Sequence, residues 1–288
     1  MSPAVAGGDS GSGSAFGDLD RPPLDGTALR QALVGPGTWW RRVEVCAQSP
    51  STNVELADLA RQEAPEGTLV TTDHQVAGRG RLGRGWESPA RSGIAASVLL
   101  RPDHVPSERW SWLPLLVGIA TVEAVRISTG VDAALKWPND VVVEDRKLAG
   151  ILLERIETPA GPAAVAGLGL NVSLREDELP VAHATSLLLC GASTTDRAVV
   201  LRAYARVLEA LYRAWAATDG DPAAGLHDSY VRRCVTLGQD IVVTASDGAV
   251  LRGNAQAIDA SGRLVLSVDG RHHRAIGAGD VVHVRART

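Results

Sequence analysis

The hydrophobic and polar positions follow two different periods along most of the chain. Apolar runs of strand length occur at 39–47, 68–72, 93–100, 133–137, 141–143, 148–154 and 163–172. Apolar residues spaced three and four positions apart, which is typical of helices, occur at 28–34, 52–60, 107–129 (with Ser111 as an alternative start), 196–218 and 226–233. The pattern predicts a mixed α/β domain. The almost wholly apolar run 93–100 is expected at a central position of its sheet, or buried on both faces.

The pattern changes after Cys234. Turn sequences at 246–248, 261–262 and 269–270 interrupt short Val, Ile and Leu runs, and this spacing predicts hairpins. At the other end, residues 1–25 are rich in small and polar residues and too poor in large apolar ones to offset the entropy of ordering. We therefore predict a disordered tail over 1–25, a mixed α/β domain over 26–234 and a small antiparallel β domain over 235–288.

One stretch between two predicted strands is unsuited to a packed core. Residues 78–86, GRGRLGRGW, hold four glycines, three arginines and one tryptophan. Glycine lets the backbone approach a ligand closely, arginine supplies forked donors for carboxylate or phosphate, and tryptophan offers a face for a base. The stretch predicts a loop over a small anionic ligand. The alternative is a flexible, solvated basic loop.

Composition and charge narrow the possible classes. The chain has 288 residues and a formal net charge of −4, so the arginine-rich loop is a local feature, and a general nucleic-acid binder is disfavoured. Cys46, Cys190 and Cys234 lie far apart and lack metal-ligand spacing, which favours reduced thiols. No signal peptide is evident, and the most apolar run, 113–127, is interrupted by two charges. We therefore predict a cytoplasmic protein without a membrane span.

Further polar residues and glycines stand at strand ends and turns. Ser51, Thr52 and Asn53 precede a predicted helix, where Thr52 and Glu55 fit a capping box, so they either contact a ligand or cap the helix. The other members are Gln75, the segment 136–140, Lys147 with Gly150 in a hairpin, and Asn171 after two glycines. The histidines are isolated or lack metal-ligand spacing. Positive charge, backbone donors and a tryptophan suit phosphoryl or adenylyl chemistry.

Three ordered motifs resemble the signatures of biotin–protein ligases. They are GRGRLGRGW at 78–86, KWPND at 136–140 followed by DRKLAGIL at 145–152, and GLGLNV at 167–172. The resemblance extends from Val43 to the C-terminus. It implies a class II synthetase-like mixed sheet with helices on one side, followed by a small β-barrel similar to a Src-homology-3 domain. Some members of this family carry an N-terminal helix-turn-helix domain, for which the segment before Trp39 is too short.

The resemblance also implies roles for individual residues. Lys147 and Arg81 would be catalytic. Biotin would contact Ser51, Thr52, Asn53, Gln75, Arg79, Gly80, Arg81, Lys147 and Gly150. ATP or the adenylate would contact Arg81, Arg84, Trp86, Lys136, Asn139, Asp140 and Asn171. Mg²⁺ would be required, with its ligands unassigned; Asp140 would lie on the metal side or cap the turn made by Pro138 and Asn139.

The implied reaction is the ATP-dependent ligation of biotin, through biotinyl-5'-adenylate, to a lysine of a biotin carboxyl carrier domain of acyl-CoA carboxylases. Two other activities remain open, a lipoate or octanoate ligase and a biotin-responsive regulator. We expect no operator DNA binding, no membrane binding, and a monomer or weak homodimer. Because four glycines make ordering costly, we expect residues 78–86 to order on binding the adenylate.

Overall fold

The structure is a computed structural model that describes residues 21–245, 248–268, 270, 272–277 and 279–283. Most of the predicted tail, residues 1–20, lies outside the described residues. The last residues of that tail make fixed contacts: Leu24 is buried, and its backbone N–H donates to Asp73 Oδ1 at 3.1 Å. The described fold therefore begins before the helix that the sequence pattern places first.

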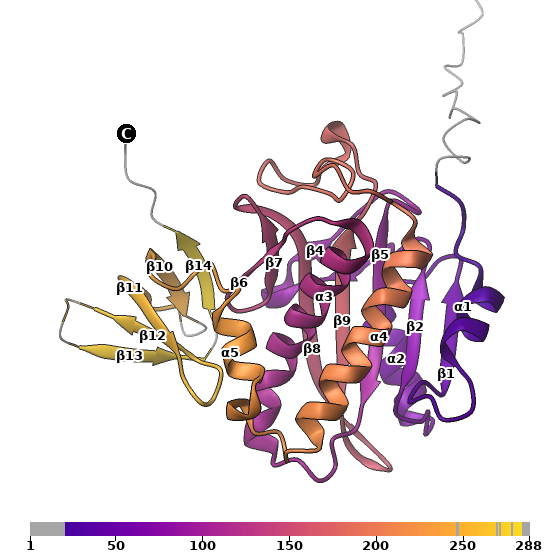
Figure 1. Cartoon of the computed structure of the whole chain (residues 1–288), viewed down its shortest axis with the longest axis horizontal. Coiled ribbons are helices and arrows are strands. Elements are labelled where there is room, and N and C mark those ends of the chain that lie inside the picture. The colour runs from indigo at the N-terminus through magenta and orange to yellow at the C-terminus, as the bar shows by residue number, and fades with distance from the viewer. Residues whose placement is uncertain (1–20, 246–247, 269, 271, 278, 284–288) are drawn as a thin grey trace, which may run out of the picture.

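A seven-stranded mixed sheet forms the body of the protein (Figure 1). Its order is β1-β2-β5-β9-β8-β7-β6, with β1 and β2 parallel and the other neighbours antiparallel. The bounds are β1 Arg42–Cys46, β2 Thr68–Thr72, β5 Gly93–Leu100, β6 Ala134–Lys136, β7 Asp140–Val143, β8 Arg146–Thr158 and β9 Gly161–Asn171. The almost wholly apolar run becomes β5, third in the sheet, with neighbours on both sides as its composition predicts.

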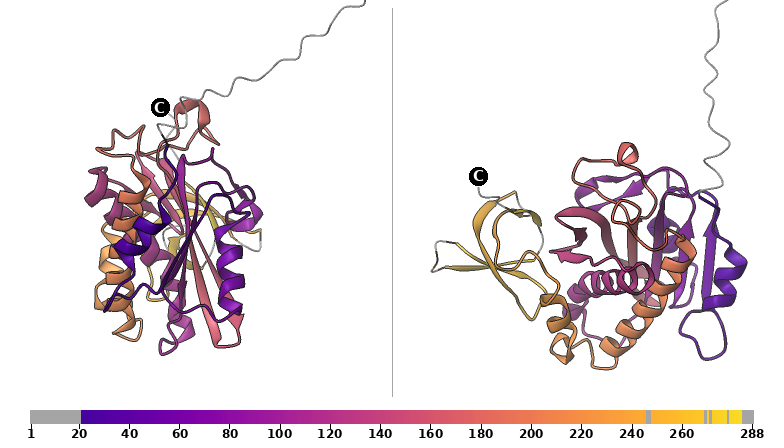
Figure 2. Two further views of the ribbon diagram at one scale, coloured as in Figure 1. Left: turned by 90° about the vertical axis from the view of Figure 1, so that its right-hand side faces the viewer. Right: turned by 45° about the horizontal axis from the view of Figure 1, so that its top comes forward.

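Helices cover both faces of this sheet (Figure 2). α1 (Gly26–Leu33), α3 (Leu113–Thr129), α4 (Arg197–Ala216) and α5 (Leu226–Val231) contribute to the larger hydrophobic core. α2 (Thr52–Arg61) packs on the opposite face, where Leu56 and Ala60 meet Leu99 of β5. The expectation of helices on one side is therefore wrong. Because successive side chains of β5 point to opposite faces and both sets are apolar, each face needs a cover.

The predicted helix at 107–129 begins with a 3-10 turn, Ser107–Trp112, and ends at Gly130, whose φ of 75° is the left-handed stop that glycine favours. By length and composition alone, Ser107–Thr129 would be able to cross a membrane, with a mean hydropathy of 1.3, which corrects the expectation that no run qualifies. However, 72% of the 18-residue apolar segment of this helix is buried inside the protein, as in a core helix.

The C-terminal part forms a five-stranded antiparallel sheet of order β13-β12-β11-β10-β14. The bounds are β10 Asp240–Ala245, β11 Val250–Ile258, β12 Leu264–Ser267, β13 His273–Ile276 and β14 Gly279–His283. The predicted turn at Ser261-Gly262 joins β11 to β12, whereas the other two predicted turns lie partly outside the described residues. Indole N–H groups hold this sheet against the body: Trp112 donates to Ala260 O at 2.8 Å and Trp137 donates to Gly262 O at 3.1 Å.

Candidate functional site

A cavity of about 510 Å³ opens beside the glycine-arginine loop, at the ends of β7, β8 and β9. Every residue assigned to the site from the sequence lines it, with the exception of Asn171. The lining residues predicted in advance are Ser51, Thr52, Asn53, Gln75, Arg79, Gly80, Arg81, Arg84, Trp86, Lys136, Asn139, Asp140, Lys147 and Gly150. The fold therefore collects residues from distant parts of the chain, such as Asn53 and Leu152, which lie 99 positions apart, around one space.

The loop itself is a small hairpin. β3 (Gly78–Arg79) pairs with β4 (Gly85–Trp86), and a 3-10 turn at Arg81–Gly83 joins them. At Gly78 the glycine is required by space, because a Cβ would lie 2.3 Å from both Trp86 O and Gln75 Nε2. This close approach places Trp86 and Gln75 on the same side of the loop, facing the cavity.

Two glycines form a flat floor under the tryptophan. Gly150 of β8 and Gly169 of β9 are cross-strand partners. A Cβ on Gly169 would lie 2.4 Å from Trp86 Cε2, and one on Gly150 would lie 3.1 Å from Trp86 Cζ3. Gly169 of the GLGLNV motif thus permits the close approach of the indole ring, whereas the motif's Gly167 is approached by the Asn53 side chain. Lys147 Nζ lies 5.7 Å from the centre of this ring.

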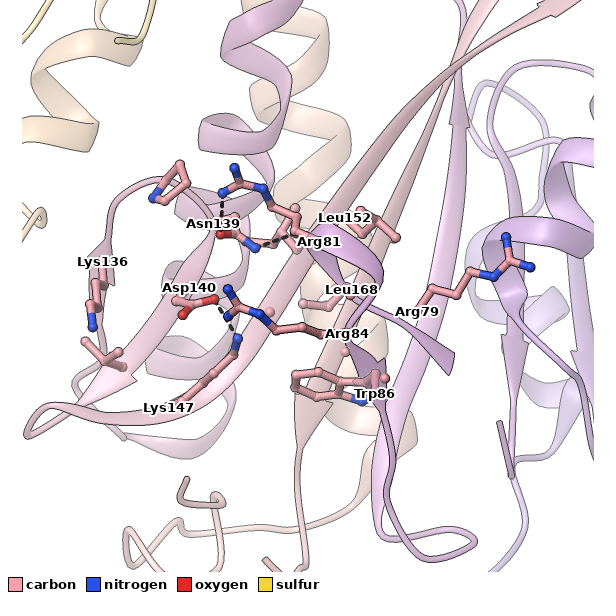
Figure 3. Close-up of a pocket in the computed structure, with 18 of the residues that line it drawn as sticks. Arg79, Arg81, Arg84, Trp86, Lys136, Asn139, Asp140, Lys147, Leu152 and Leu168 are labelled. Atoms are coloured by element: carbon pink, nitrogen blue, oxygen red, sulfur yellow. Dashed lines mark hydrogen bonds and ion pairs between the residues drawn. The ribbon is translucent and has the colours of Figure 1, made fainter. Parts of the chain in front are cut away.

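Cations and two side chains of the KWPND motif meet next to Trp86 (Figure 3). Lys147 Nζ forms an ion pair with Asp140 Oδ1 at 2.7 Å, and both side chains are 26% exposed. Arg81 donates to Asn139 Oδ1 at 3.0 Å, and Asn139 Nδ2 in turn donates to Ile151 O at 2.9 Å. Burial lowers the pKa of the Arg81 guanidinium, and the nearby Asp140 carboxylate opposes that shift. Arginine nonetheless keeps its charge at neutral pH.

The three loop arginines do not point the same way. In Figure 3, Arg84 extends toward Asp140 and Lys147, whereas the Arg79 side chain points away from that group. Arg79 is exposed, although it still lines the cavity. The described geometry therefore gives Arg81 and Arg84, rather than Arg79, the place nearest Lys147.

The capping box predicted for α2 is wrong. Ser51 is the N-cap residue and its side chain makes no capping bond, while Thr52 already belongs to the helix. The Thr52 backbone N–H donates instead to Gln75 Oε1 at 3.0 Å. A side chain from the loop after β2 thus satisfies the N-terminal donor that Glu55 would take in a capping box. Ser51 and Thr52 both line the cavity.

Asn171 does not line the cavity in this structure. It is buried, its Nδ2 donates to Thr185 O at 2.9 Å, and its backbone O accepts from Leu187 N–H at 3.1 Å. Its observed contacts hold the segment 185–187 in place. Asp140, for which turn capping was the alternative, begins β7 and pairs with Lys147.

Sequence reasoning missed two parts of the cavity wall. His183, treated as an isolated histidine, lines the cavity, and its backbone O accepts from Lys147 N–H at 2.7 Å. β14 of the C-terminal sheet also contributes, through Gly279, Val281, Val282 and His283. Neither segment carries a motif, so no local signal could have found them. Within the described parts of the chain, His, Cys, Asp and Glu side chains form no group of three suited to a metal ion.

Two family models match this chain. The model described as "Biotin/lipoate A/B protein ligase family" matches residues 44–171, and "Biotin protein ligase C terminal domain" matches residues 236–284. The first match covers the cavity motifs and the second covers the C-terminal sheet.

Curated proteins show the same likeness. A Mycobacterium tuberculosis protein named biotin--[acetyl-CoA-carboxylase] ligase is 42% identical over 93% of this chain and 98% of its own length. A Bacillus subtilis protein named bifunctional ligase/repressor BirA is 33% identical over 76% of this chain and 67% of its own length. Part of that repressor protein therefore lies outside the match.

Among solved structures, the biotin protein ligase from Aquifex aeolicus in complex with biotin and ATP has a TM-score of 0.70 at 24% identity, over 86% of this chain and 100% of that one. This likeness concerns the fold. The fold and cavity define a ligase-type α/β domain followed by a small β domain. With the matches to curated proteins, the chain belongs to the biotin protein ligase family.

Proposed function

We propose that the protein joins biotin to a lysine of a biotin carboxyl carrier domain in two steps. A biotin carboxylate oxygen attacks the α-phosphorus of ATP, which forms biotinyl-5'-adenylate and releases pyrophosphate. The lysine amine, having given up its proton, then attacks the acyl carbon, which forms the amide and releases AMP. A carboxylate is a poor acyl donor at neutral pH, so the first step supplies the leaving group that the second step needs.

The cavity offers a distinct environment at each end for these substrates. Ser51, Thr52 and Gln75 lie at the α2 end and would hydrogen-bond the ring system of biotin. The Trp86 ring, which lies directly on Gly150 and Gly169, adds an apolar wall to the cavity. Lys147, Arg81 and Arg84 lie at the other end, where the biotin carboxylate would meet the triphosphate.

Positive charge is what the first step needs most. It brings a carboxylate onto an already anionic phosphate, so fixed cations lower both the repulsion and the energy of the in-line transition state. Lys147 is held for this task by Asp140 through its 2.7 Å ion pair. Arg79, Gly80, Lys136, Asn139 and Asn171 remain proposed contacts of biotin or the adenylate.

Mg²⁺ is proposed to accompany ATP. This ion is usually held by one or two protein carboxylates together with substrate phosphates, and Asp140 supplies a carboxylate at the phosphate end of the cavity. When bound, the ion would neutralise phosphate charge. The donor set fits this use.

The observation that carries the proposal is the convergence of Lys147, Arg81 and Trp86 on one cavity, on a chain 42% identical to a protein named biotin--[acetyl-CoA-carboxylase] ligase. The test is biotin-dependent exchange of labelled pyrophosphate into ATP. We expect Lys147→Ala to lose about 100-fold or more in exchange rate, comparable to the loss of one oxyanion-hole donor. Arg155→Ala, on the same strand but outside the cavity lining, is the matched control. Near-normal exchange by a folded Lys147→Ala enzyme would contradict the assignment.

The same assay separates the rival activities. Exchange driven by lipoate or octanoate in place of biotin would move the substrate and keep the mechanism. We propose that the protein does not bind operator DNA, is a monomer or weak homodimer, and is cytoplasmic. A gel shift on the protein's own promoter, sedimentation with and without biotin and ATP, and cell fractionation test these three points.

A further inference from the structure

A chain of polar side chains runs from the half-buried Glu154 of β8, through the buried Asn53 and Ser97, to Thr52 at the N-terminus of α2. Asn53 Nδ2 donates to Glu154 Oε2 at 2.6 Å and to Leu152 O at 3.3 Å. On the other side, the Ser97 hydroxyl lies 2.6 Å from Asn53 Oδ1 and 2.7 Å from Thr52 Oγ1. Of these residues, Thr52 and Asn53 line the cavity, whereas Glu154 and Ser97 do not.

Glu154 fixes which way the Asn53 amide faces. A carboxylate oxygen and a backbone carbonyl, both pure acceptors, lie on one side of that amide, so its NH₂ group must point there. Its Oδ1 therefore faces Ser97 and can only accept. Asn53 is 5% exposed, and its position is closed in further by Gly167, where a Cβ would lie 2.2 Å from Asn53 Oδ1.

The orientation of the Asn53 amide determines which partner receives the hydroxyl proton of Ser97. Ser97 has a single hydroxyl proton, and Asn53 Oδ1, the nearer partner, can only accept it. Ser97 is placed to donate to Thr52 Oγ1 as well, at 2.7 Å, but its one proton serves a single partner. Once that proton goes to Asn53 Oδ1, which cannot donate, the contact between the two hydroxyls needs the proton of Thr52. The Thr52 oxygen is left to present its lone pairs to the cavity.

Gln75 adds a second acceptor at the same place. Its Oε1 is identified as the oxygen of the amide because the Thr52 backbone N–H donates to it at 3.0 Å. Thr52 Oγ1 is also placed to donate to that oxygen, but at 3.3 Å, whereas its contact with Ser97 is 2.7 Å and is the shorter use of its one proton. With the Thr52 proton committed to Ser97, two acceptors stand side by side on the wall, an arrangement that an N–H donor of the ligand would satisfy.

We propose that Glu154 is a positioning residue for substrate recognition: through Asn53 and Ser97 it sets the Thr52 oxygen as an acceptor and so selects a carboxylic acid that carries N–H donors. The urea ring of biotin has such donors, and the dithiolane of lipoate has none. The inference rests on the proposed function, because it assigns the α2 end of the cavity to the biotin ring.

The experiment compares Glu154→Gln with Glu157→Gln, an exposed glutamate three residues along the same strand. A glutamine at 154 can offer either end of its amide, so the Asn53 orientation loses its shorter acceptor at 2.6 Å and is held on that side only by Leu152 O at 3.3 Å. In pyrophosphate exchange we expect the KM for biotin to rise about tenfold, equivalent to roughly 1.4 kcal/mol, with the KM for ATP unchanged. Glu157→Gln should match the wild type.

Two further readouts separate this role from a merely structural one. If Glu154 acts through Thr52, the double variant Glu154→Gln with Thr52→Val should have the KM of Thr52→Val alone. Desthiobiotin, which keeps the urea and lacks the sulfur, should be affected by Glu154→Gln as biotin is. Additive effects in the double variant would overturn the proposal.

Each remaining outcome is also decisive. Where Glu154→Gln fails to fold, Ser97→Ala breaks the same chain at its middle and should raise the KM for biotin by a similar factor. A normal biotin KM in a folded Glu154→Gln or Ser97→Ala enzyme overturns the inference while the exchange reaction stands. Absence of biotin-dependent exchange in the wild type overturns the proposed function instead.

Discussion

Gly169 should be the most sensitive small residue of the cavity, and Gly169→Ala is the substitution that tests it. An added Cβ would lie 2.4 Å from Trp86 Cε2, 2.7 Å from Nε1 and 2.8 Å from Cζ2. Carbon atoms in contact are normally about 3.5–4.0 Å apart, so the ring or the strand has to move by about 1 Å. The strand is held on both sides, by Ala95 of β5 and Gly150 of β8. The ring is therefore the part that gives way.

The size of the effect follows from that displacement. Overfilling a packed site costs about 1–3 kcal/mol, which corresponds to roughly 5- to 150-fold in an equilibrium constant. Trp86 is half-buried and belongs to a two-residue strand, so its displacement should cost the fold little. Because Trp86 is proposed to lie against the adenylate, the loss should appear mainly as a higher KM for ATP.

The assay is pyrophosphate exchange at varied ATP, with thermal unfolding measured on the same samples. Gly35→Ala is the control, since a Cβ there would meet no atom within 4 Å. A folded Gly169→Ala enzyme with an ordinary KM for ATP would refute the reasoning, because it would mean that the indole is not needed where the structure places it. A large loss of thermal stability with normal kinetics would refute the statement that the ring, and not the strand, moves.

Two further predictions concern stability. The hydrogen bond from Arg21 is the main cause that lowers the pKa of Glu178. Because the pKa is lower in the folded state, this contact stabilises the protein above the unfolded pKa of about 4.3, and the stabilisation is lost as pH falls through the folded pKa. The difference in melting temperature between wild type and Glu178→Gln should therefore shrink from pH 6 to pH 3, and a constant difference would contradict the prediction. Trp137→Phe removes the indole donor to Gly262 O and should destabilise the protein by about 1–3 kcal/mol in urea unfolding; an unchanged free energy of unfolding would show that this contact does not hold the C-terminal sheet.

The run 93–100 shows how a sequence pattern can outweigh a resemblance. Its residues are apolar at nearly every position, which predicts burial on both faces or a central position in the sheet. The family likeness, in contrast, led to the expectation of helices on one side. The structure follows the residues: Val98 and Leu100 face the core of α3 and α4, and Leu99 faces α2. The reason is physical: apolar side chains on both faces of a strand must be shielded from water, whichever family the fold belongs to.

Two parts of the cavity wall, β14 and His183, could not be predicted from the sequence for a different reason. The lining residues with signature motifs were predictable because glycines and cations at unusual density have few structural uses. β14 and His183 reach the cavity only through tertiary packing, namely the docking of the C-terminal sheet and the backbone bond between His183 O and Lys147 N. Nothing in the composition of either segment reflects that contact.

The N-terminus of α2 shows why a correct motif can still give the wrong geometry. Thr52 and Glu55 have the spacing of a capping box, and a threonine that capped its own helix would have its oxygen occupied by a backbone N–H. Here Gln75 takes the Thr52 N–H from outside the helix. The N-cap of the helix is Ser51, so Thr52 is its first residue and its oxygen contacts Ser97 and the cavity. A local cap and a ligand contact compete for the same oxygen, and the competition is settled by the helix starting one residue earlier than the motif implies. Gln75, from a distant loop, accepts from the Thr52 N–H that Glu55 would take in a capping box, and a local sequence rule cannot predict that contact.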